Sequence, residues 1–282
     1  MPGTLFVVAT PIGNLEDISA RALRVLGEAS IVAAEDTRRT RQLLERYAIR
    51  TPTTSFHEHN ETGKSGALLA RLARGEHVAL VSDAGTPVVS DPGQTLIRAA
   101  IDAGIRVETI PGPSAVMAAL AGSGLPAETF TFLGFPPTKA NDRKRWFEAV
   151  RTAGRTVIFF EAPHRIAETL HQLRATVGDC QVAVGRELTK VHEEWVRGPI
   201  SRVSEALTEP RGEFTVVAEI GQMADVEPSS RPVGADILRE FSEMTKIAGV
   251  TKRKAINVIA RRHGLPPNQV YEAIERAKKS IV

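Results

Sequence analysis

The sequence predicts an α/β protein with two sheets and a small helical module at its C-terminal end. Three observations support this prediction. Short apolar runs alternate with helical patterns over residues 1–121, which is typical of a mainly parallel sheet covered by helices. Over residues 122–222, extended segments follow one another with fewer helices between them, which favours a mixed sheet. Residues 233–282 carry three short helical patterns joined by tight breaks, which resemble a helix-turn-helix module.

Two stretches mark the expected domain boundaries. Glycine and proline become frequent over residues 121–127 (AGSGLPA), where we place the division between the two α/β domains. Residues 222–232 (QMADVEPSSRP) have little apolar content and predict a linker. The predicted domains are therefore 1–121, 122–222 and 233–282.

Local patterns predict each element of the first domain. Ser19 is placed to cap a helix and Gly75 to end one, while Leu43, Leu44 and Tyr47 give one helix an inward apolar stripe. Short apolar or β-prone runs predict the strands. The strands are expected at residues 4–9, 31–34, 51–56, 78–81 and 106–110, and the helices at 20–29, 37–48, 66–75, 94–104 and 114–122.

The same reasoning gives the remaining elements. Residues 136–146 (PPTKANDRKRW) predict a polar, basic loop and a helix start, and 186–198 (RELTKVHEEWVRG) are assigned no regular element. Strands are expected at 129–135, 156–160, 181–184 and 214–220, and helices at 164–178, 237–249, 251–264 and 266–280.

Composition limits the class of protein. The 282 residues are 42% hydrophobic and 24% charged, as in an ordinary globular chain large enough for two domains. The single Cys180 excludes an intrachain disulfide, which fits a reducing compartment. No apolar run approaches the roughly 20 residues that span a bilayer, and the first strand begins without a basic leader. We therefore expect a cytoplasmic protein with no membrane partner.

The positive charge is concentrated in the tail. Residues 231–282 carry a net charge of +6, whereas the preceding part of the chain carries −3. A basic terminal module suits a nucleic-acid partner, because Lys and Arg neutralise phosphates. A solvated helical surface rich in Lys and Arg is the alternative, and charge alone leaves both open.

Residues 78–93 (VALVSDAGTPVVSDPG), here termed the central stretch, organise the first domain. A buried strand runs into a turn made by Gly85 and Pro87, and a second turn leads into a helix. Strands 4–9 and 106–110 end in similar turns, TPIGN and PGPSA. Open α/β sheets bind ligands beyond the carboxyl ends of their strands, so we expect one ligand across these three strand ends.

Nucleotide and metal motifs are absent or incomplete. Gly63, Lys64 and Ser65 imitate the end of a phosphate-binding loop, but Glu58 stands where the first glycine is required, and no GxGxxG follows a strand. His57, Glu58 and His59 lack a third ligand at a recognisable spacing. We expect no metal and interpret these three residues as a polar loop that meets the substrate.

Carboxylates at strand ends are candidates for ligand contact. Asp36 and Asp83 face the expected crevice, where they can accept hydrogen bonds from a ligand, although Asp also caps turns. We favour ligand contact for these two. For Asp91, directly before Pro92, we expect helix capping.

Charged residues also follow strands of the second domain. Glu161, His164 and Arg165 follow one strand, and Arg186 and Glu187 follow another. Such residues are either paired structurally or exposed to a cleft, and both alternatives stay open. The aromatic side chains of Trp195 and Phe214 are expected in the core.

Several motifs in the same order resemble a known family. VSDAGTPVVSDPG, with VATPIGNLEDIS, AEDTRRT, FHEHN, IPGPSA, FFEAPHR and GRELTKVHEE, is similar to the tetrapyrrole methylase superfamily, a class of S-adenosylmethionine-dependent methyltransferases. AEDTRRT, FHEHN and EAPHR indicate its RsmI-type 16S ribosomal RNA (cytidine 2′-O) methyltransferases. The resemblance covers essentially the whole chain and is looser in the tail.

This resemblance implies two α/β domains with S-adenosylmethionine in the cleft between them, a homodimer, and the small ribosomal subunit as partner, with a cytidine in the decoding region of 16S RNA as the target. Carried over residue by residue, it implies cofactor contacts at Pro11, Gly13, Asp83, Ala84, Gly85, Pro87, Ser114, Ala115, Phe160, Glu161, Val217 and Ala218. It implies substrate contacts at Arg38, His57, Glu58, His164 and Arg165.

The implied reaction is in-line attack of a ribose 2′ oxygen on the sulfonium methyl group. Glu187 or Asp36 is the expected base, and Arg38 or Arg186 the expected phosphate contact. Two alternatives are a corrin or porphyrin methyltransferase, against which the basic tail argues, and a ligand-sensing nucleic-acid-binding regulator.

Overall fold

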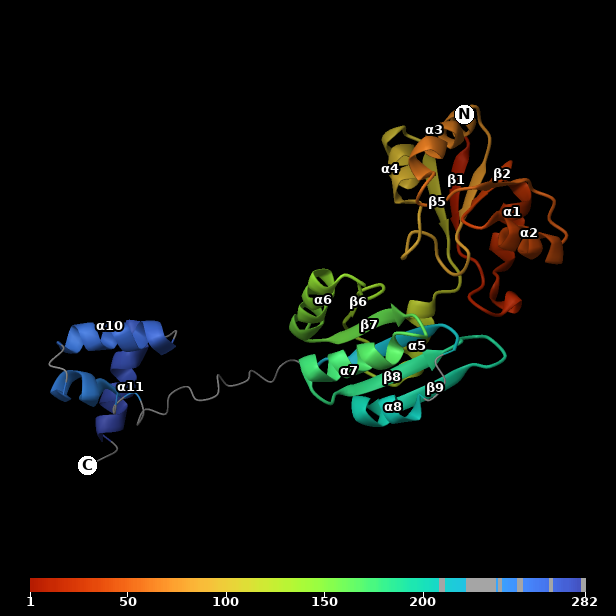
Figure 1. The fold of residues 1–282 in the computed structure, drawn as a ribbon. Coiled ribbons are helices and arrows are strands. Elements are labelled where there is room, and N and C mark those ends of the chain that lie inside the picture. Colours follow the sequence, from red (N-terminus) through yellow and green to blue (C-terminus); the bar gives the residue numbers. More distant parts are fainter. Residues whose placement is uncertain (208–210, 222–236, 238–239, 248–250, 264–265, 280–282) are drawn as a thin grey trace. The chain divides into compact units, whose positions relative to one another are not determined.

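The computed structural model describes residues 1–207, 211–221, 237, 240–247, 251–263 and 266–279. They belong to two compact units, Met1–Gln222 and Met223–Val282 (Figure 1). The predicted linker, 222–232, lies outside the described residues.

The first sheet has five strands, and every pairing between them is parallel. The spatial order is β3-β2-β4-β1-β5, so the carboxyl ends of all five strands lie at one edge. The alternation of strands and helices therefore predicted this sheet correctly. Its strands are β1 (Thr4–Val8), β2 (Ile31–Ala34), β3 (Thr53–Ser55), β4 (Val78–Val81) and β5 (Arg106–Ile110).

Helices cover both faces of this sheet (Figure 1). One core cluster joins α1 and α2 to one face, and a second joins α3 and α4 to the other. Successive residues of β4 alternate between the clusters, with Ala79 and Val81 in the first and Val78 and Leu80 in the second. These helices are α1 (Ala20–Glu28), α2 (Thr37–Arg46), α3 (Glu61–Ala73) and α4 (Gln94–Asp102), with a short 3-10 helix, η1, at Leu15–Asp17.

The second sheet is mixed, as predicted, with the order β6-β7-β10-β8-β9. Only β6 and β7 pair in parallel, while β10 runs antiparallel to β7 and β8. β9 and α8 lie in segments where the sequence predicted no element, because β9 forms a hairpin partner for β8. The strands are β6 (Phe130–Phe132), β7 (Thr156–Glu161), β8 (Gln181–Arg186), β9 (Glu194–Pro199) and β10 (Phe214–Glu219).

Helices also cover both faces of the second sheet. Helices α6 (Ala140–Thr152), α7 (Ile166–Val177) and α8 (Ile200–Ala206) share one core cluster with it. On the opposite face, α5 (Ala115–Ser123) packs against the centres of β7, β8 and β10. Helix α5 thus packs on the second sheet, although it spans residue 121, where we expected the domain boundary. A boundary between the two α/β domains at that residue stays a prediction.

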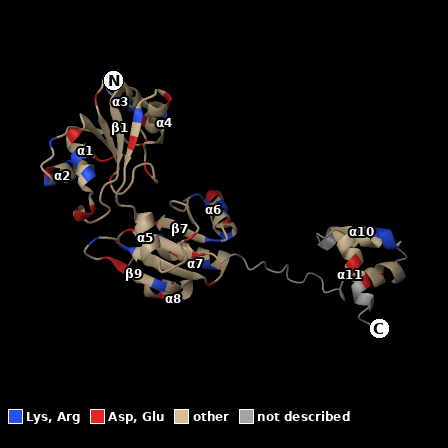
Figure 2. Ribbon diagram, turned by 180° about the vertical axis from the view of Figure 1, so that it is seen from behind, with Lys and Arg blue, Asp and Glu red and all other residues tan. Residues whose placement is uncertain are grey.

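The C-terminal unit has its own apolar core. Its described elements include a π-helix, η2 (Glu243–Ile247), and two helices, α10 (Lys252–His263) and α11 (Pro267–Lys279). Ala255, Ile259, Val270 and Ile274 are buried between these elements. The side chains of residues 252–254 are exposed at the start of α10, where Figure 2 shows basic colour.

None of the helices within the described residues has both the length and the apolar character needed to cross a membrane.

Candidate functional site

The three strand ends singled out in the sequence meet at one edge of the first sheet. Thr10 and Gly85 exchange backbone hydrogen bonds, with N···O distances of 2.9 and 3.0 Å. The Thr86 hydroxyl donates to the carbonyl oxygen of Pro113 at 3.2 Å. Gly85 has φ +81°, which favours glycine, so the turn after β4 depends on this residue. The ends of β1, β4 and β5 are thereby joined into one surface.

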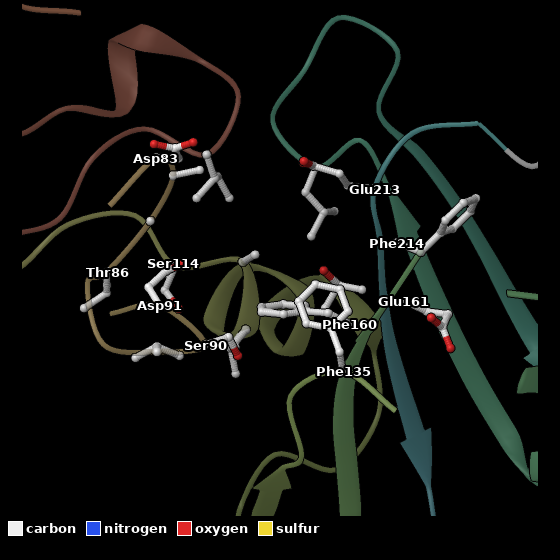
Figure 3. Close-up of a pocket in the computed structure, with 18 of the residues that line it drawn as sticks. Asp83, Thr86, Ser90, Asp91, Ser114, Phe135, Phe160, Glu161, Glu213 and Phe214 are labelled. Atoms are coloured by element: carbon white, nitrogen blue, oxygen red, sulfur yellow. The ribbon is translucent and has the colours of Figure 1, made fainter. Parts of the chain in front are cut away.

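A cavity of about 390 Å³ lies between this surface and the second sheet. Figure 3 shows Asp83, Thr86, Ser90 and Ser114 on one wall and residues of the second sheet on the other. We term this cavity the larger cavity, because a smaller one lies beside it. Its volume is within the ~300–1,000 Å³ range of small-molecule sites. It is lined by Ile12, Arg39, Asp83, Ala84, Gly85, Thr86, Val89, Ser90, Asp91, Ser114, Ala115, Val116, Phe135, Phe160, Glu161, Ala162, Pro163, Leu188, Glu213, Phe214 and Thr215.

Aromatic rings form part of the second-sheet wall. The ring centroids of Phe135 and Phe160 are 5.4 Å apart, and Phe132 packs edge-on against Phe160 at 4.9 Å. The Phe135 side chain is 54% exposed although it is large and apolar. Such a surface suits a flat, partly apolar ligand group such as a nucleobase.

Three carboxylates from separate segments cluster beside the first-sheet wall. Burial and the nearby Asp83 carboxylate raise the pKa of Glu35. Burial, followed by the charge of Glu35, raises the pKa of Asp91 to about 6, although a hydrogen bond with Ser82 opposes this. Of these groups, Asp83 and Asp91 line the larger cavity. At the cavity wall, the pKa of Asp91 thus lies closer to neutral pH than that of an ordinary carboxyl group.

The expectation that Asp91 caps a helix is wrong. Helix α4 begins after Gly93, and Glu61 of α3 accepts hydrogen bonds from the backbone N–H groups of Gly93 and Thr95 at 3.2 and 3.0 Å. Asp91 is left free to contact Ser82 and the cavity. The sequence did not predict this cap, because the capping carboxylate belongs to the preceding helix and is distant in the chain.

Seven of the twelve residues expected to contact a cofactor line the larger cavity. They are Asp83, Ala84, Gly85, Ser114, Ala115, Phe160 and Glu161. Pro11 lines a neighbouring, smaller cavity. Pro87 is buried outside both cavity linings. Gly13 abuts the loop after β8, since an added Cβ would lie 2.5 Å from Lys190 Cγ.

Val217 and Ala218 lie in the core and do not line the larger cavity. Because β10 is antiparallel to β7, the first residues of β10 lie beside the end of β7, with Phe214 opposite Glu161 and Thr215 opposite Phe160. The cavity is therefore lined by Glu213, Phe214 and Thr215. The direction of β10 was not readable from its apolar run.

Glu161 uses its carboxylate within the protein. Its side chain is fully buried, accepts hydrogen bonds from the Thr169 hydroxyl and the Ala162 N–H, and forms an ion pair with Arg165. Figure 3 shows the carboxylate directed away from the opposite wall of the cavity. Arg165 also donates to the carbonyl oxygen of Pro136. For Glu161 and Arg165, the structure supports structural pairing of the two alternatives.

Asp36 and Arg38 are engaged with each other. Asp36 is the N-cap of α2 and accepts a hydrogen bond from the Arg38 N–H at 2.8 Å. Hydrogen bonds from the Arg38 side chain and backbone lower the pKa of Asp36. Neither residue lines the larger cavity. The neighbouring Arg39 does, with its guanidinium 3.5 Å from Asp83 Oδ2, and sequence reasoning missed it.

Glu187 pairs with Lys190, and Arg186 pairs with Glu194. Both residues lie outside the lining of the larger cavity. Burial raises the pKa of Glu187, but hydrogen bonds from Lys190 and the Glu213 N–H outweigh it and bring the pKa below its usual value. Arg186 Nε lies 2.9 Å from Glu194 Oε2 in an ion pair. A carboxylate with a lowered pKa is a weak proton acceptor, so this geometry does not favour Glu187 as a base.

The remaining expected substrate residues are at separate places. His57 begins the turn before α3, where the Asn60 side chain bonds its N–H and ring, and Glu58 is exposed next to it. His164 is exposed after β7. The structure does not bring these residues together at the larger cavity. In the described part of the chain, no group of three or more His, Cys, Asp or Glu residues is arranged to hold a metal ion.

A smaller cavity of about 210 Å³ shares Arg39 and Asp83 with the larger one. Its other walls come from the turn after β1, the end of β4 and helix α2. They are Thr10, Pro11, Leu15, Thr40, Gln42, Leu43 and Ser82.

Comparison with known families gives one match to a family model. The model described as Tetrapyrrole (Corrin/Porphyrin) Methylases matches residues 4–204, which include the first sheet and strands β6 to β9 of the second.

Curated proteins named Ribosomal RNA small subunit methyltransferase I are similar over nearly the whole chain. The protein from Pseudomonas aeruginosa is 45% identical, with 99% of each chain covered. Those from Synechocystis sp. and Bacillus subtilis are 42% and 40% identical, covering 96% of this chain and 96% and 94% of theirs.

Solved structures share the fold at low identity. Diphthine synthase superposes with a TM-score of 0.63 at 17% identity, covering 77% of this chain and 90% of its own. Uroporphyrin-III C-methyl transferase from Thermus thermophilus complexed with S-adenosyl homocysteine gives 0.55 at 19% identity, covering 77% and 98%.

Proposed function

Because the chain belongs to the tetrapyrrole (corrin/porphyrin) methylase family and, within it, to the ribosomal RNA small subunit methyltransferase I proteins, we propose that it transfers a methyl group from S-adenosylmethionine to small-subunit ribosomal RNA. The proposed acceptor is the 2′ oxygen of a cytidine ribose. A ribosomal substrate implies work in the cytoplasm, and we propose a homodimer as the active form.

The larger cavity is the observation that carries the proposal. Its volume is within the range of small-molecule sites, and its walls suit the cofactor's parts: phenylalanine rings for a base, and carboxylates and small polar groups for a ribose and an amino acid. Asp83, Gly85, Ser114, Ala115 and Phe160 would hold it. A Cβ at Gly85 would lie 3.3 Å from Ile12 Cγ2, so glycine keeps this wall open.

S-adenosylmethionine, when bound, supplies a methyl group already activated by a positive sulfur. The enzyme's residues then have to align the acceptor and remove the 2′ hydroxyl proton as the oxygen–carbon bond forms and the carbon–sulfur bond breaks. We assign Asp91 as the proton acceptor. It lines the larger cavity, and it is not engaged in helix capping. Asp36 and Glu187 are held by hydrogen bonds elsewhere.

Two basic surfaces would contact the RNA backbone. Arg38, Arg39 and Arg41 are exposed on α2, and Arg39 lines both cavities. The exposed side chains of residues 252–254 lie on the C-terminal unit. Phosphate contacts supply affinity that does not depend on sequence and that falls as salt rises.

Incubation with radiolabelled S-adenosylmethionine tests the proposal. Free 16S RNA, small ribosomal subunits and a corrinoid are offered in parallel, and labelled nucleosides are identified after digestion. We expect label in RNA or subunits, recovered as 2′-O-methylcytidine. Transfer only to the corrinoid would overturn the RNA substrate, and no transfer to any acceptor would favour a ligand-sensing regulator.

A further inference from the structure

The smaller cavity is positioned to serve the same reaction from the acceptor side. It shares Arg39 and Asp83 with the larger cavity, so a group bound there lies next to the site proposed for the cofactor. Its volume of about 210 Å³ is below the ~300–1,000 Å³ typical of pockets that enclose a whole small molecule. A part of a larger molecule, with the rest outside, fits this size.

The lining of the smaller cavity suits a nucleoside. Pro11, Leu15 and Leu43 offer apolar surface to a base or a sugar ring. The Gln42 side chain, exposed on α2, carries both a donor and an acceptor for a base edge. The Leu15 side chain is 42% exposed, so this apolar wall is accessible from outside.

Arg39 lines the smaller cavity and also exposes its charge at the protein surface. Its side chain is 67% exposed and lies 3.5 Å from Asp83, a distance that leaves donors of the guanidinium available. Arg38 and Arg41 are exposed on the same helix. Arginines beside a cavity hold the phosphates that flank an inserted nucleotide, as enzymes that act on single nucleotides require.

We propose that the smaller cavity receives the target nucleoside of the RNA. Gln42 would then contact the nucleobase, and Arg39 would contact a flanking phosphate. This assignment rests on the proposed function. It gives the two cavities different occupants and makes the shared Arg39–Asp83 pair the boundary where the two reactants meet. The proposed base, Asp91, lies next to this boundary, because it hydrogen-bonds Ser82 of the smaller cavity.

Filling the smaller cavity with a new side chain tests the assignment. Gln42→Trp places an indole at its lining, and Glu45→Trp places the same group on an exposed position of α2 that lines neither cavity. We expect Gln42→Trp to reduce methyl transfer by roughly 10²-fold, the order that misplacement of a reactant costs. Calorimetry should give unchanged affinity for S-adenosylhomocysteine, and RNA binding to the product-saturated enzyme should weaken. Glu45→Trp should behave as wild type.

The outcomes separate this assignment from the proposed function. Normal transfer and RNA affinity in Gln42→Trp would overturn it, and parallel loss of S-adenosylhomocysteine affinity would assign the smaller cavity to the cofactor instead. A wild-type protein that methylates no RNA would overturn the proposed function and this assignment together. A wild-type protein that methylates RNA, beside an unaffected Gln42→Trp, would overturn the cavity assignment alone.

Discussion

Replacing Asp91 by asparagine is expected to slow methyl transfer by about 10²–10⁴-fold, the usual contribution of a general base. The amide keeps the size and the hydrogen bonding of the side chain but does not accept the proton. Affinity for S-adenosylhomocysteine, measured by calorimetry, should change little. Equal losses of affinity and of rate would instead make Asp91 a cofactor contact.

The pH dependence gives a second reading of the same variant. The wild-type rate should fall as pH drops through about 6, where Asp91 becomes protonated, and this limb should be absent in Asp91→Asn. Asp36→Asn and Glu187→Gln are matched controls, because asparagine also caps helices and both carboxylates are already paired. A larger loss of rate in either control would indicate that Asp36 or Glu187 is the base, as the sequence predicted.

The raised pKa of Asp91 also predicts the sign of a stability change. A carboxyl group whose pKa is higher in the folded than in the unfolded state favours folding when protonated, and this contribution is lost as pH rises through its folded pKa of about 6. Asp91→Asn should therefore melt at a higher temperature than wild type at pH 7. The difference should vanish below the unfolded pKa, near 3.8. A lower melting temperature at pH 7 would indicate a structural role.

Replacing Glu161 by alanine is expected to lower the free energy of unfolding by about 3–5 kcal/mol, as for other buried ion pairs broken from one side. The change leaves Arg165, the Thr169 hydroxyl and the Ala162 N–H without their buried acceptor. Urea unfolding followed by tryptophan fluorescence measures the loss, because Trp146 and Trp195 both pack beside the second sheet.

Glu168→Ala is the matched control for Glu161→Ala. Glu168 is exposed on α7, where its carboxylate accepts a hydrogen bond from the Gln172 side-chain amide, so its removal should change stability by less than about 0.5 kcal/mol. If Glu161 instead contacted the cofactor through its carboxylate, Glu161→Ala would weaken cofactor affinity and leave the unfolding curve unchanged.

Much of the fold was predictable because its signals are local. The parallel sheet follows from alternating apolar runs and helical patterns, and the meeting of three strand ends follows from their parallel direction. The second sheet was predictable only as mixed. β9 was missed, since its half-exposed residues form a strand by pairing with β8 and carry no apolar run of their own.

The sequence predicted which strand ends form the site, but it did not predict which individual residues line it. Arg38 and Arg39 are adjacent in the sequence, yet consecutive helical residues point about 100° apart, and only Arg39 reaches the cavities. On β10, the antiparallel direction moved the lining from Val217 to the first residues of the strand.

The sequence by itself determined the two sheets, the strand ends that form the binding surface, and the resemblance to a methyltransferase family. These depend on periodicity and on motifs within short segments. Only the tertiary structure decided which carboxylates are free and which are paired, because Glu61, Glu161 and Glu187 find partners that the chain brings from other segments. Burial beside Glu35 likewise gave Asp91 a raised pKa, and neither its burial nor that neighbour can be derived from the residues around it.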